Sequence, residues 1–268
     1  MMAMFKAKPK TPNIRLFDSH CHLDFPVFDS DRDAIFEQMR KVGIEGVLIP
    51  GVKKENWRFI RQLAAIKPGV QVALGLHPMF LKEHRKEHVH DLELATGIKP
   101  LAAIGEIGLD YYDKNLDRKI QIALFKAQLE IAKSCKLPVI LHVRKAHEDV
   151  LLYLKTMKFQ EGGIVHAFNG SLQQAERYRE FGFKLGFGGA ITYQRAIKLR
   201  DLAKSLPLTD IVLETDAPDM LPANTDKKHN SPLLIFNNFN ALVELREESA
   251  EEIARQTTEN SRQILRVS

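Results

Sequence analysis

The sequence has few cysteines and no long apolar run, and each absence excludes a class of protein. Its 268 residues include only Cys21 and Cys135, too few for a disulfide framework or for a zinc site built mainly of thiolates. No apolar run approaches the roughly 20 residues that span a bilayer. Residues 1–13 contain lysines but no apolar stretch of signal-peptide length. These absences predict a soluble cytoplasmic protein without a membrane or protein partner, beginning with a flexible basic tail at 1–13.

The chain also lacks a stretch rich in proline, glycine or serine that would divide it into domains. Hydrophobic residues make up 44% and charged residues 27% of the sequence, which is typical of a globular protein with a sizeable core. We therefore expect one domain over 14–268. The formal net charge of +5 agrees only weakly with a polyanionic partner, because three of the lysines lie in the tail.

Short apolar runs recur along the chain, with helical patterns between them. The runs are near-continuous stretches of apolar residues, as in parallel strands covered on both faces, and lie at 15–21, 46–50, 70–76, 101–107, 138–143, 162–168, 183–188 and 210–214. Helices are expected at 31–42, 117–136, 172–181, 232–246 and 249–264, with capping residues such as Ser30 and Ser171 at their starts. This alternation predicts an α/β fold, a (β/α)8 TIM barrel. A doubly wound open sheet is the alternative.

Titratable side chains cluster at the carboxyl ends of these runs, where a barrel carries its active site. His20 and His22 are two residues apart, so on a strand they would share one face. Two imidazoles on one face suit a divalent metal, although two core histidines that satisfy each other would give the same pattern. The other strand-end candidates are His77, Glu106, Asp110, His142, Arg144, His166, Glu214 and Asp216.

The number of these groups favours metal over packing. Burying so many titratable side chains without partners would cost several kcal/mol each, and coordination removes that cost. Six ligands are too many for one tetrahedral ion but suit two ions about 3.5–4 Å apart. Glu106 is the natural bridging carboxylate. Glu214 competes with Asp216 for the role of second carboxylate, because the two would share a strand face.

These motifs together resemble the TatD-type metal-dependent deoxyribonucleases, a family of amidohydrolase-like barrels. The resemblance runs from Phe17 to about Leu265. Its motifs are D-S-H-C-H-L at 18–23, G-L-H-P at 75–78, G-E-I-G-L-D at 105–110, P-V-I-L-H-V-R at 138–144, H-A-F-N-G-S at 166–171 and E-T-D-A-P at 214–218. Two positions depart from the family pattern: Asn169 replaces a usual serine, and His229 replaces an arginine near the last helices.

The resemblance implies a ligand set for two divalent ions, with zinc, magnesium or manganese as candidates. His20, His22 and Asp216 would hold one ion, His142 and His166 the other, and Glu106 would bridge them. Asp216 is also the candidate general base. His77 and Arg144 are candidates for holding a phosphate, and Tyr111 for stacking on a base. Alternatives are a turn-capping His77, an Arg144 paired with Glu148 or Asp149, and a Tyr111 that only packs.

Three functions are compatible with this reading. The first is hydrolysis of DNA, exonucleolytic on single strands, by water activated at the two metals, with Asp216 and Glu106 as the catalytic carboxylates. The second is hydrolysis of a carbonyl substrate such as an amide, a lactone or an aminoacyl ester on tRNA. The third is a barrel with structural metal that binds a partner, which the open ligand set disfavours.

Overall fold

A computed structural model describes residues 14–267, and the predicted basic tail at 1–13 lies outside the described residues. Eight parallel strands follow one another around a single sheet in chain order. They are β1 Leu16–Asp18, β2 Ile44–Pro50, β3 Val70–Leu74, β4 Ala103–Asp110, β5 Val139–Arg144, β6 Gly163–Val165, β7 Phe183–Phe187 and β8 Ile211–Leu213. Beyond β1, the Ser19 backbone N–H donates to the Leu213 carbonyl at 3.0 Å, which brings the last strand beside the first. The predicted (β/α)8 barrel is confirmed, and the doubly wound alternative is wrong.

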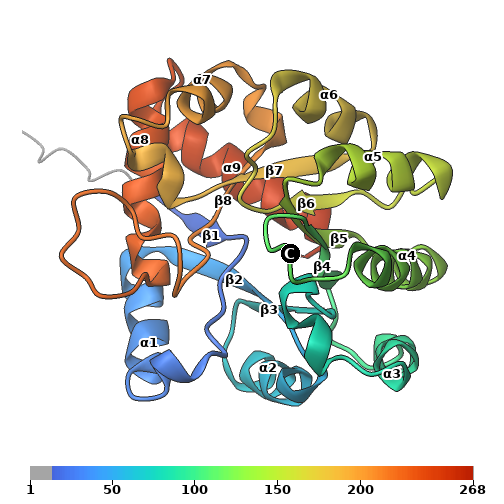
Figure 1. Ribbon diagram of the computed structural model, residues 1–268. Helices are drawn as coiled ribbons and strands as arrows, with labels where there is room; N and C mark the ends of the chain where they lie inside the picture. The colour runs from blue at the N-terminus through green and yellow to red at the C-terminus, as the bar shows by residue number, and fades with distance from the viewer. Residues whose placement is uncertain (1–13, 268) are drawn as a thin grey trace, which may run out of the picture.

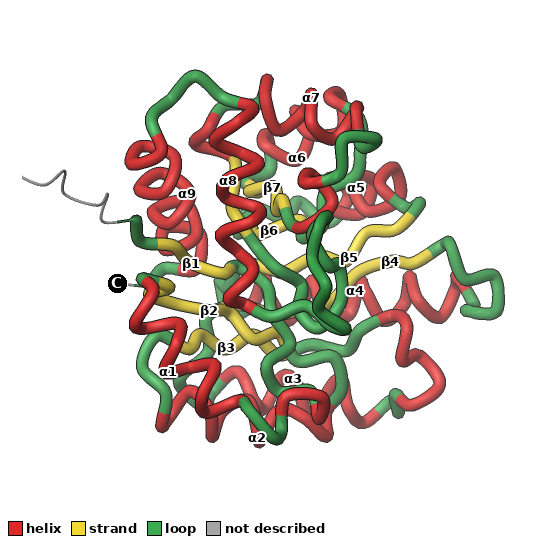
Figure 2. The backbone as a smooth tube through the Cα atoms, turned by 90° about the vertical axis from the view of Figure 1, so that its left-hand side faces the viewer, coloured by secondary structure: helices red, strands yellow, loops and turns green. Residues whose placement is uncertain are grey.

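Helices surround the strands on the outside, as Figure 1 shows in a view down the barrel. The α-helices are α1 Arg32–Val42, α2 Lys54–Ile66, α3 Glu87–Thr96, α4 Arg118–Ser134, α5 His147–Thr156, α6 Leu172–Glu180, α7 Ile197–Ser205, α8 Ile235–Leu245 and α9 Ala250–Leu265. Short 3-10 helices are η1 Pro26–Phe28, η2 Pro78–Glu83, η3 Gly189–Thr192, η4 Leu208–Asp210 and η5 Pro232–Leu234. Figure 2 shows α8 and α9 beside each other after the last strand. No helix within residues 14–267 is both long and apolar enough to cross a membrane.

The core has two parts because strand side chains alternate between the helices and the barrel interior. The larger part packs strands against helices. A separate buried cluster takes one residue from every strand except β7: Phe17, Leu48, Ala73, Ala103, Ile140, Ile164 and Val212. Leu265 of α9 joins this cluster, and α9 also reaches the start of the barrel, where Thr258 Oγ1 donates to the Arg15 carbonyl. The last helix therefore covers the end of the barrel where the strands begin.

Several predicted element bounds differ from the structure. β1 ends at Asp18, so His20 and His22 lie beyond the strand. The prediction that they share one strand face was wrong. α1 begins after Asp31 rather than Ser30. The predicted Ser171 cap of α6 is confirmed, because its hydroxyl accepts the Gln174 N–H and the Gln174 side chain accepts the Ser171 N–H.

Candidate metal centre

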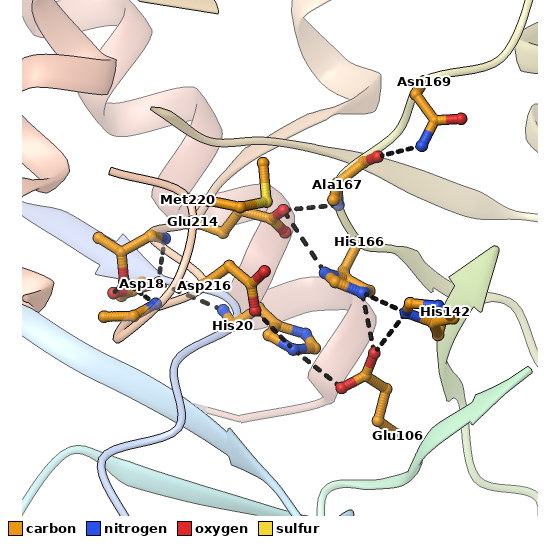
Figure 3. Close-up of polar contacts among 12 residues, drawn as sticks. Asp18, His20, Glu106, His142, His166, Ala167, Asn169, Glu214, Asp216 and Met220 are labelled. Carbon is orange, nitrogen blue, oxygen red and sulfur yellow. Dashed lines mark hydrogen bonds and ion pairs between the residues drawn. The ribbon is translucent and has the colours of Figure 1, made fainter. Parts of the chain in front are cut away.

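Three titratable residues of the centre each follow, two positions later in the chain, an apolar residue of the barrel interior. Ile140, Ile164 and Val212 belong to the interior cluster. His142, two residues further along and still within β5, points the same way. His166 and Glu214 are also two residues further along, but they lie just beyond the ends of β6 and β8. Figure 3 shows these side chains meeting with others from β4 and from the segments after β1 and β8.

Glu106 lies at the middle of this cluster and divides its two oxygens between two sets of histidines. Its Oε2 is 3.2 Å from His20 Nε2 and 3.5 Å from His22 Nε2. Its Oε1 is 2.8 Å from His166 Nε2 and 3.2 Å from His142 Nδ1. The carboxylate is nearly inaccessible to solvent. One side chain thus connects two groups of potential ligands.

Asp216 completes the first of these groups. Its Oδ1 is 3.5 Å from His20 Nε2 and 3.7 Å from His22 Nε2, and those two nitrogens lie 3.3 Å apart. In the second group, His142 Nδ1 lies 3.3 Å from His166 Nε2. His20, His22 and Asp216 have ligand atoms close enough for one ion, and so do Glu106 with His20 and His166, and Glu106 with His77 and His142.

These distances fit a bound cation better than a network of hydrogen bonds. Four tetrahedral ligands at about 2.0–2.2 Å from one ion lie about 3.3–3.6 Å from each other, and the separations around His20 and His22 fall at or near that spacing. Two neutral imidazole nitrogens that face each other and two carboxylate oxygens have too few protons to satisfy all of these contacts. A divalent cation would satisfy all four donor atoms at once.

The pKa values show how strongly the centre favours positive charge. Burial raises the pKa of Glu106, but the nearby His77, His166 and His20 outweigh it and hold that pKa well below its usual value. Burial lowers the pKa of His166, yet the Glu106 carboxylate reverses this and raises it to about 10. Burial raises the pKa of Asp216 to about 7. Without metal, an ionised glutamate thus retains a protonated histidine, and a bound cation would replace that proton.

His77 faces the same centre as a donor rather than as a ligand. Its Nδ1 accepts the Met79 backbone N–H at 3.1 Å, so in the neutral ring the proton is on Nε2. Burial lowers the pKa of His77 and keeps the ring neutral. The Nε2–H lies 3.1 Å from Glu106 Oε1. One ring therefore caps the turn before η2 with Nδ1, the alternative role considered from the sequence, and directs its Nε2–H to Glu106. Its role in holding a phosphate stays a prediction.

Two carboxylates behind the candidate ligands were not assigned such a role from the sequence. Asp110 Oδ2 lies 3.0 Å from His142 Nε2, and its Oδ1 accepts the backbone N–H groups of Tyr112 and Asp113. Asp18 accepts the Thr215 N–H and hydroxyl at 2.9 and 2.6 Å. A carboxylate on the second nitrogen of a metal-binding histidine fixes its tautomer and orientation, so the position of Asp110 at a strand end was the available signal.

Glu214 lies in the same layer but does not take the place of Asp216. It is fully buried, and its Oε1 accepts the Ala167 backbone N–H at 2.6 Å. It approaches His166 Nδ1 only to 3.8 Å. Burial raises the pKa of Glu214 to about 8. Its Oε2 has no hydrogen-bond partner among the described residues, so Glu214 supports the chain around His166 from behind.

The predicted substrate residues occupy different positions at the mouth. The Arg144 guanidinium stacks on the Tyr112 ring, with its carbon 3.7 Å from the ring centroid. Within residues 14–267 no carboxylate forms an ion pair with Arg144, and Glu148 pairs instead with Arg177. Tyr111 is half-buried and its hydroxyl donates to Asp149 at 2.6 Å. Arg144 is thus available to an anion, whereas the Tyr111 hydroxyl already has a partner.

A cavity of about 520 Å³ opens beside the centre, between the ends of β5 to β8. His142, His166 and Asp216 line one side of it, and Arg144 and Asn169 lie at its edge. Most of the remaining lining is apolar, from Met79, Val143, Phe168, Phe187, Ala190, Leu199 and Met220. The volume lies within the range of about 300–1,000 Å³ that is usual for a small-molecule site.

The comparisons with known proteins agree with this geometry. The family model described as TatD related DNase matches residues 17–266. The chain is 40% identical over 255 residues to the protein of Escherichia coli K12 named "Uncharacterized metal-dependent hydrolase YjjV", a match that covers 94% of this chain and 98% of the relative. A crystal structure of YjjV superposes with a TM-score of 0.91 at 39% identity, covering 96% of this chain and all of that one.

A second relative has a more specific name. The chain is 30% identical over 259 residues to an Erwinia billingiae protein named "3'-5' ssDNA/RNA exonuclease TatD", which covers 94% of this chain and 99% of the relative. Fold, site and relatives define this chain as a metal-dependent hydrolase. It belongs to the TatD-related DNase family, as the sequence motifs predicted.

Proposed function

We propose that the centre binds two divalent ions and hydrolyses phosphodiester bonds of single-stranded DNA. The observation that carries the proposal is the division of the Glu106 oxygens between two groups of donors. One group is His20, His22 and Asp216, and the other is His142 and His166. The ions would lower the pKa of a bound water and neutralise charge on a phosphoryl oxygen.

The side chains around the ions have distinct tasks in this proposal. Asp216 lies at the edge of the cavity, where its carboxylate can accept the proton of the attacking water. The His77 Nε2–H bonds to Glu106 Oε1 and would donate to a phosphoryl oxygen once the ions hold that carboxylate. Arg144 has no carboxylate partner within the described chain, and its planar guanidinium suits two phosphate oxygens. We retain Tyr111 as a stacking candidate through its ring, although its hydroxyl is engaged by Asp149.

Positive charge and an aromatic ring at the mouth favour a nucleic-acid strand as the substrate. Arg144 and Lys145 both lie over the Tyr112 ring, with distances of 3.7 and 4.9 Å to its centroid, and Tyr112 is more than half exposed. Such a group can bind a backbone phosphate and a base together. Lys227 and Lys228 instead line a separate groove against α1. The exonuclease name of the Erwinia relative supports cleavage from an end.

The test is cleavage of end-labelled single-stranded DNA by metal-stripped protein supplied with Mg²⁺, Mn²⁺ or Zn²⁺. Asp216→Asn should lower the metal-restored rate by at least about 100-fold, the scale of a lost general base. Asparagine suits the positive φ of 55° at this position, so the change spares the backbone. Asp226→Asn, an exposed acid on the loop before η5, is the matched control and should cleave like wild type.

A circular single strand distinguishes the mode of cleavage, because an exonuclease leaves it intact. Equal cleavage of linear DNA by Asp216→Asn and wild type would overturn the assignment of Asp216. Stoichiometric metal binding without cleavage under any metal would overturn the DNA proposal. The apolar cavity beside the centre would then favour the second candidate, a carbonyl substrate such as an aminoacyl ester, which hydrolysis of model esters would test.

A further inference from the structure

A chain of hydrogen bonds leads from the helix layer to the edge of the cavity. His147 lies between Tyr178 and Asn169, with its Nδ1 3.2 Å from the Tyr178 hydroxyl and its Nε2 3.1 Å from Asn169 Oδ1. The Asn169 Nδ2 donates to the Ala167 carbonyl at 3.1 Å, a contact drawn in Figure 3. These contacts connect α5 and α6 to the loop that follows His166.

The direction of each bond follows from the chemistry of the groups. An amide oxygen only accepts, so His147 Nε2 carries a proton and donates to Asn169 Oδ1. Burial keeps the His147 ring neutral by lowering its pKa, so Nδ1 accepts from the Tyr178 hydroxyl. The Asn169 amide is therefore held in one orientation. One of its N–H groups bonds to Ala167, and no described residue accepts the other.

Asn169 lies at a cavity whose accessible lining is mostly apolar. Asn169 lines the cavity together with Phe168, Phe187 and Leu199. Phe168 and Phe187 are almost completely buried, so the accessible apolar lining comes mainly from Met79, Leu199 and Met220. The same cavity is lined by His142, His166 and Asp216. A chemical group bound in this cavity would therefore lie next to the metal centre.

We propose that this cavity binds the nucleobase of the nucleotide being released, with the Asn169 amide N–H donating to an acceptor on the base edge. The inference rests on the proposed function and names the base site of the same centre. Every nucleobase carries carbonyl or ring-nitrogen acceptors, and its apolar faces gain free energy when they are buried against apolar side chains. His147 acts as a positioning residue, because it contacts Asn169 and lies behind it. The serine usual at this position is too short to make the same contacts.

Calorimetric binding to the metal-loaded protein tests the base site without any turnover. The two probes are thymidine 5'-monophosphate and 2-deoxyribose 5-phosphate, which carries a hydroxyl group where the nucleotide carries the base. Wild type should bind the nucleotide at least about fivefold more tightly, from the apolar area that the base buries in the cavity. Asn169→Leu should lower nucleotide affinity by about three- to tenfold, the value of one hydrogen bond, and leave the sugar phosphate unchanged. Gln173→Leu, which also replaces a side-chain amide by leucine but at an exposed position of α6, is the control.

Two further measurements separate positioning from a merely structural role. His147→Phe should reduce the preference for the nucleotide as Asn169→Leu does, while metal content and melting temperature confirm that the variant is folded. With thymidine 5'-(p-nitrophenyl phosphate), Asn169→Leu should raise KM more than it lowers kcat. The ratio of kcat/KM for this substrate to kcat/KM for bis(p-nitrophenyl) phosphate, which lacks a base, should fall in Asn169→Leu.

The outcomes distinguish this inference from the proposed function. Equal affinity of wild type for the two probes, or unchanged nucleotide affinity in Asn169→Leu, overturns the base site even if DNA is cleaved. A base preference that depends on Asn169 supports the site even if no DNA is cleaved, and in that case the proposed nuclease function fails alone.

Discussion

At the scale of single residues, one glycine makes room for a buried carboxylate behind the centre. β7 contributes no side chain to the interior cluster, and Gly186 lies beside the side chain of Glu214, the residue that follows β8. A Cβ at Gly186 would overlap the Glu214 carboxylate oxygen. Glu214 in turn holds the Ala167 N–H next to His166. The missing side chain at Gly186 is therefore part of how the barrel positions His166.

Gly186→Ala should destabilise the protein by about 1–3 kcal/mol, the usual cost of overpacking, and should lower metal affinity by displacing Glu214. Urea unfolding and metal titration measure the two effects. Gly97→Ala is the control, because its Cβ would meet nothing closer than the Leu94 carbonyl at 3.6 Å, so stability should change by less than about 1 kcal/mol. Equal stability of the two variants would show that Glu214 moves aside freely.

At the scale of elements, the helix starts decide how the loops at the mouth are held. α6 begins with a complete capping box formed by Ser171 and Gln174. The loop just before it contains His166, a candidate ligand of the metal centre, and Asn169, which lines the cavity. The first backbone N–H groups of a helix lack partners unless a cap supplies them. The Ser171 cap thus fixes the end of the loop that follows β6.

Ser171→Ala should cost about 0.5–2 kcal/mol of stability, the measured range for a lost N-cap. Urea denaturation followed by circular dichroism gives the value. Gln173→Ala lies two positions further along on the exposed side of the same helix and should stay within about 0.5 kcal/mol of wild type. A Ser171 variant as stable as the Gln173 variant would mean that packing alone sets where α6 begins.

At the scale of the whole molecule, the centre couples metal binding to folding. Its candidate ligands come from β4, β5 and the segments after β1, β6 and β8, so they come together only when the barrel is formed. A ligand that binds the native state alone stabilises it in proportion to the logarithm of its concentration. Removing metal should therefore lower the melting temperature of the entire domain.

Adding Zn²⁺ or Mn²⁺ at about 100 times its dissociation constant should stabilise metal-stripped protein by about 2.7 kcal/mol. For a domain of this size that corresponds to a rise of roughly 5–10 °C in melting temperature. Calorimetry or fluorescence melting would record it. At the same metal concentration, the rise in melting temperature should be smaller in His22→Ala than in wild type. It should equal the wild-type rise in His90→Ala, whose ring is exposed on α3. A rise of the same size in the His22 variant would contradict the assigned ligand set.

The sequence by itself determined the strand order, the barrel and the set of strand-end residues. Apolar runs of strand length alternate with helical patterns, and parallel strands joined by helices place all carboxyl ends at one rim. His142 and His166 could be assigned to the centre for this reason. The alternation argument failed for His20 and His22, because β1 ends at Asp18, although both side chains reach the predicted cluster.

Only the tertiary structure decided which atoms face which partners. That Glu106 divides its oxygens, that Asp110 supports His142 and that Asn169 is oriented by His147 all depend on side chains from different strands. Sequence periodicity fixes the face on which a residue lies, but not its rotamer or its neighbour across the barrel. Those are set by packing, which involves residues far apart in the chain. The chemistry present at the rim was therefore readable from the sequence, and its arrangement was not.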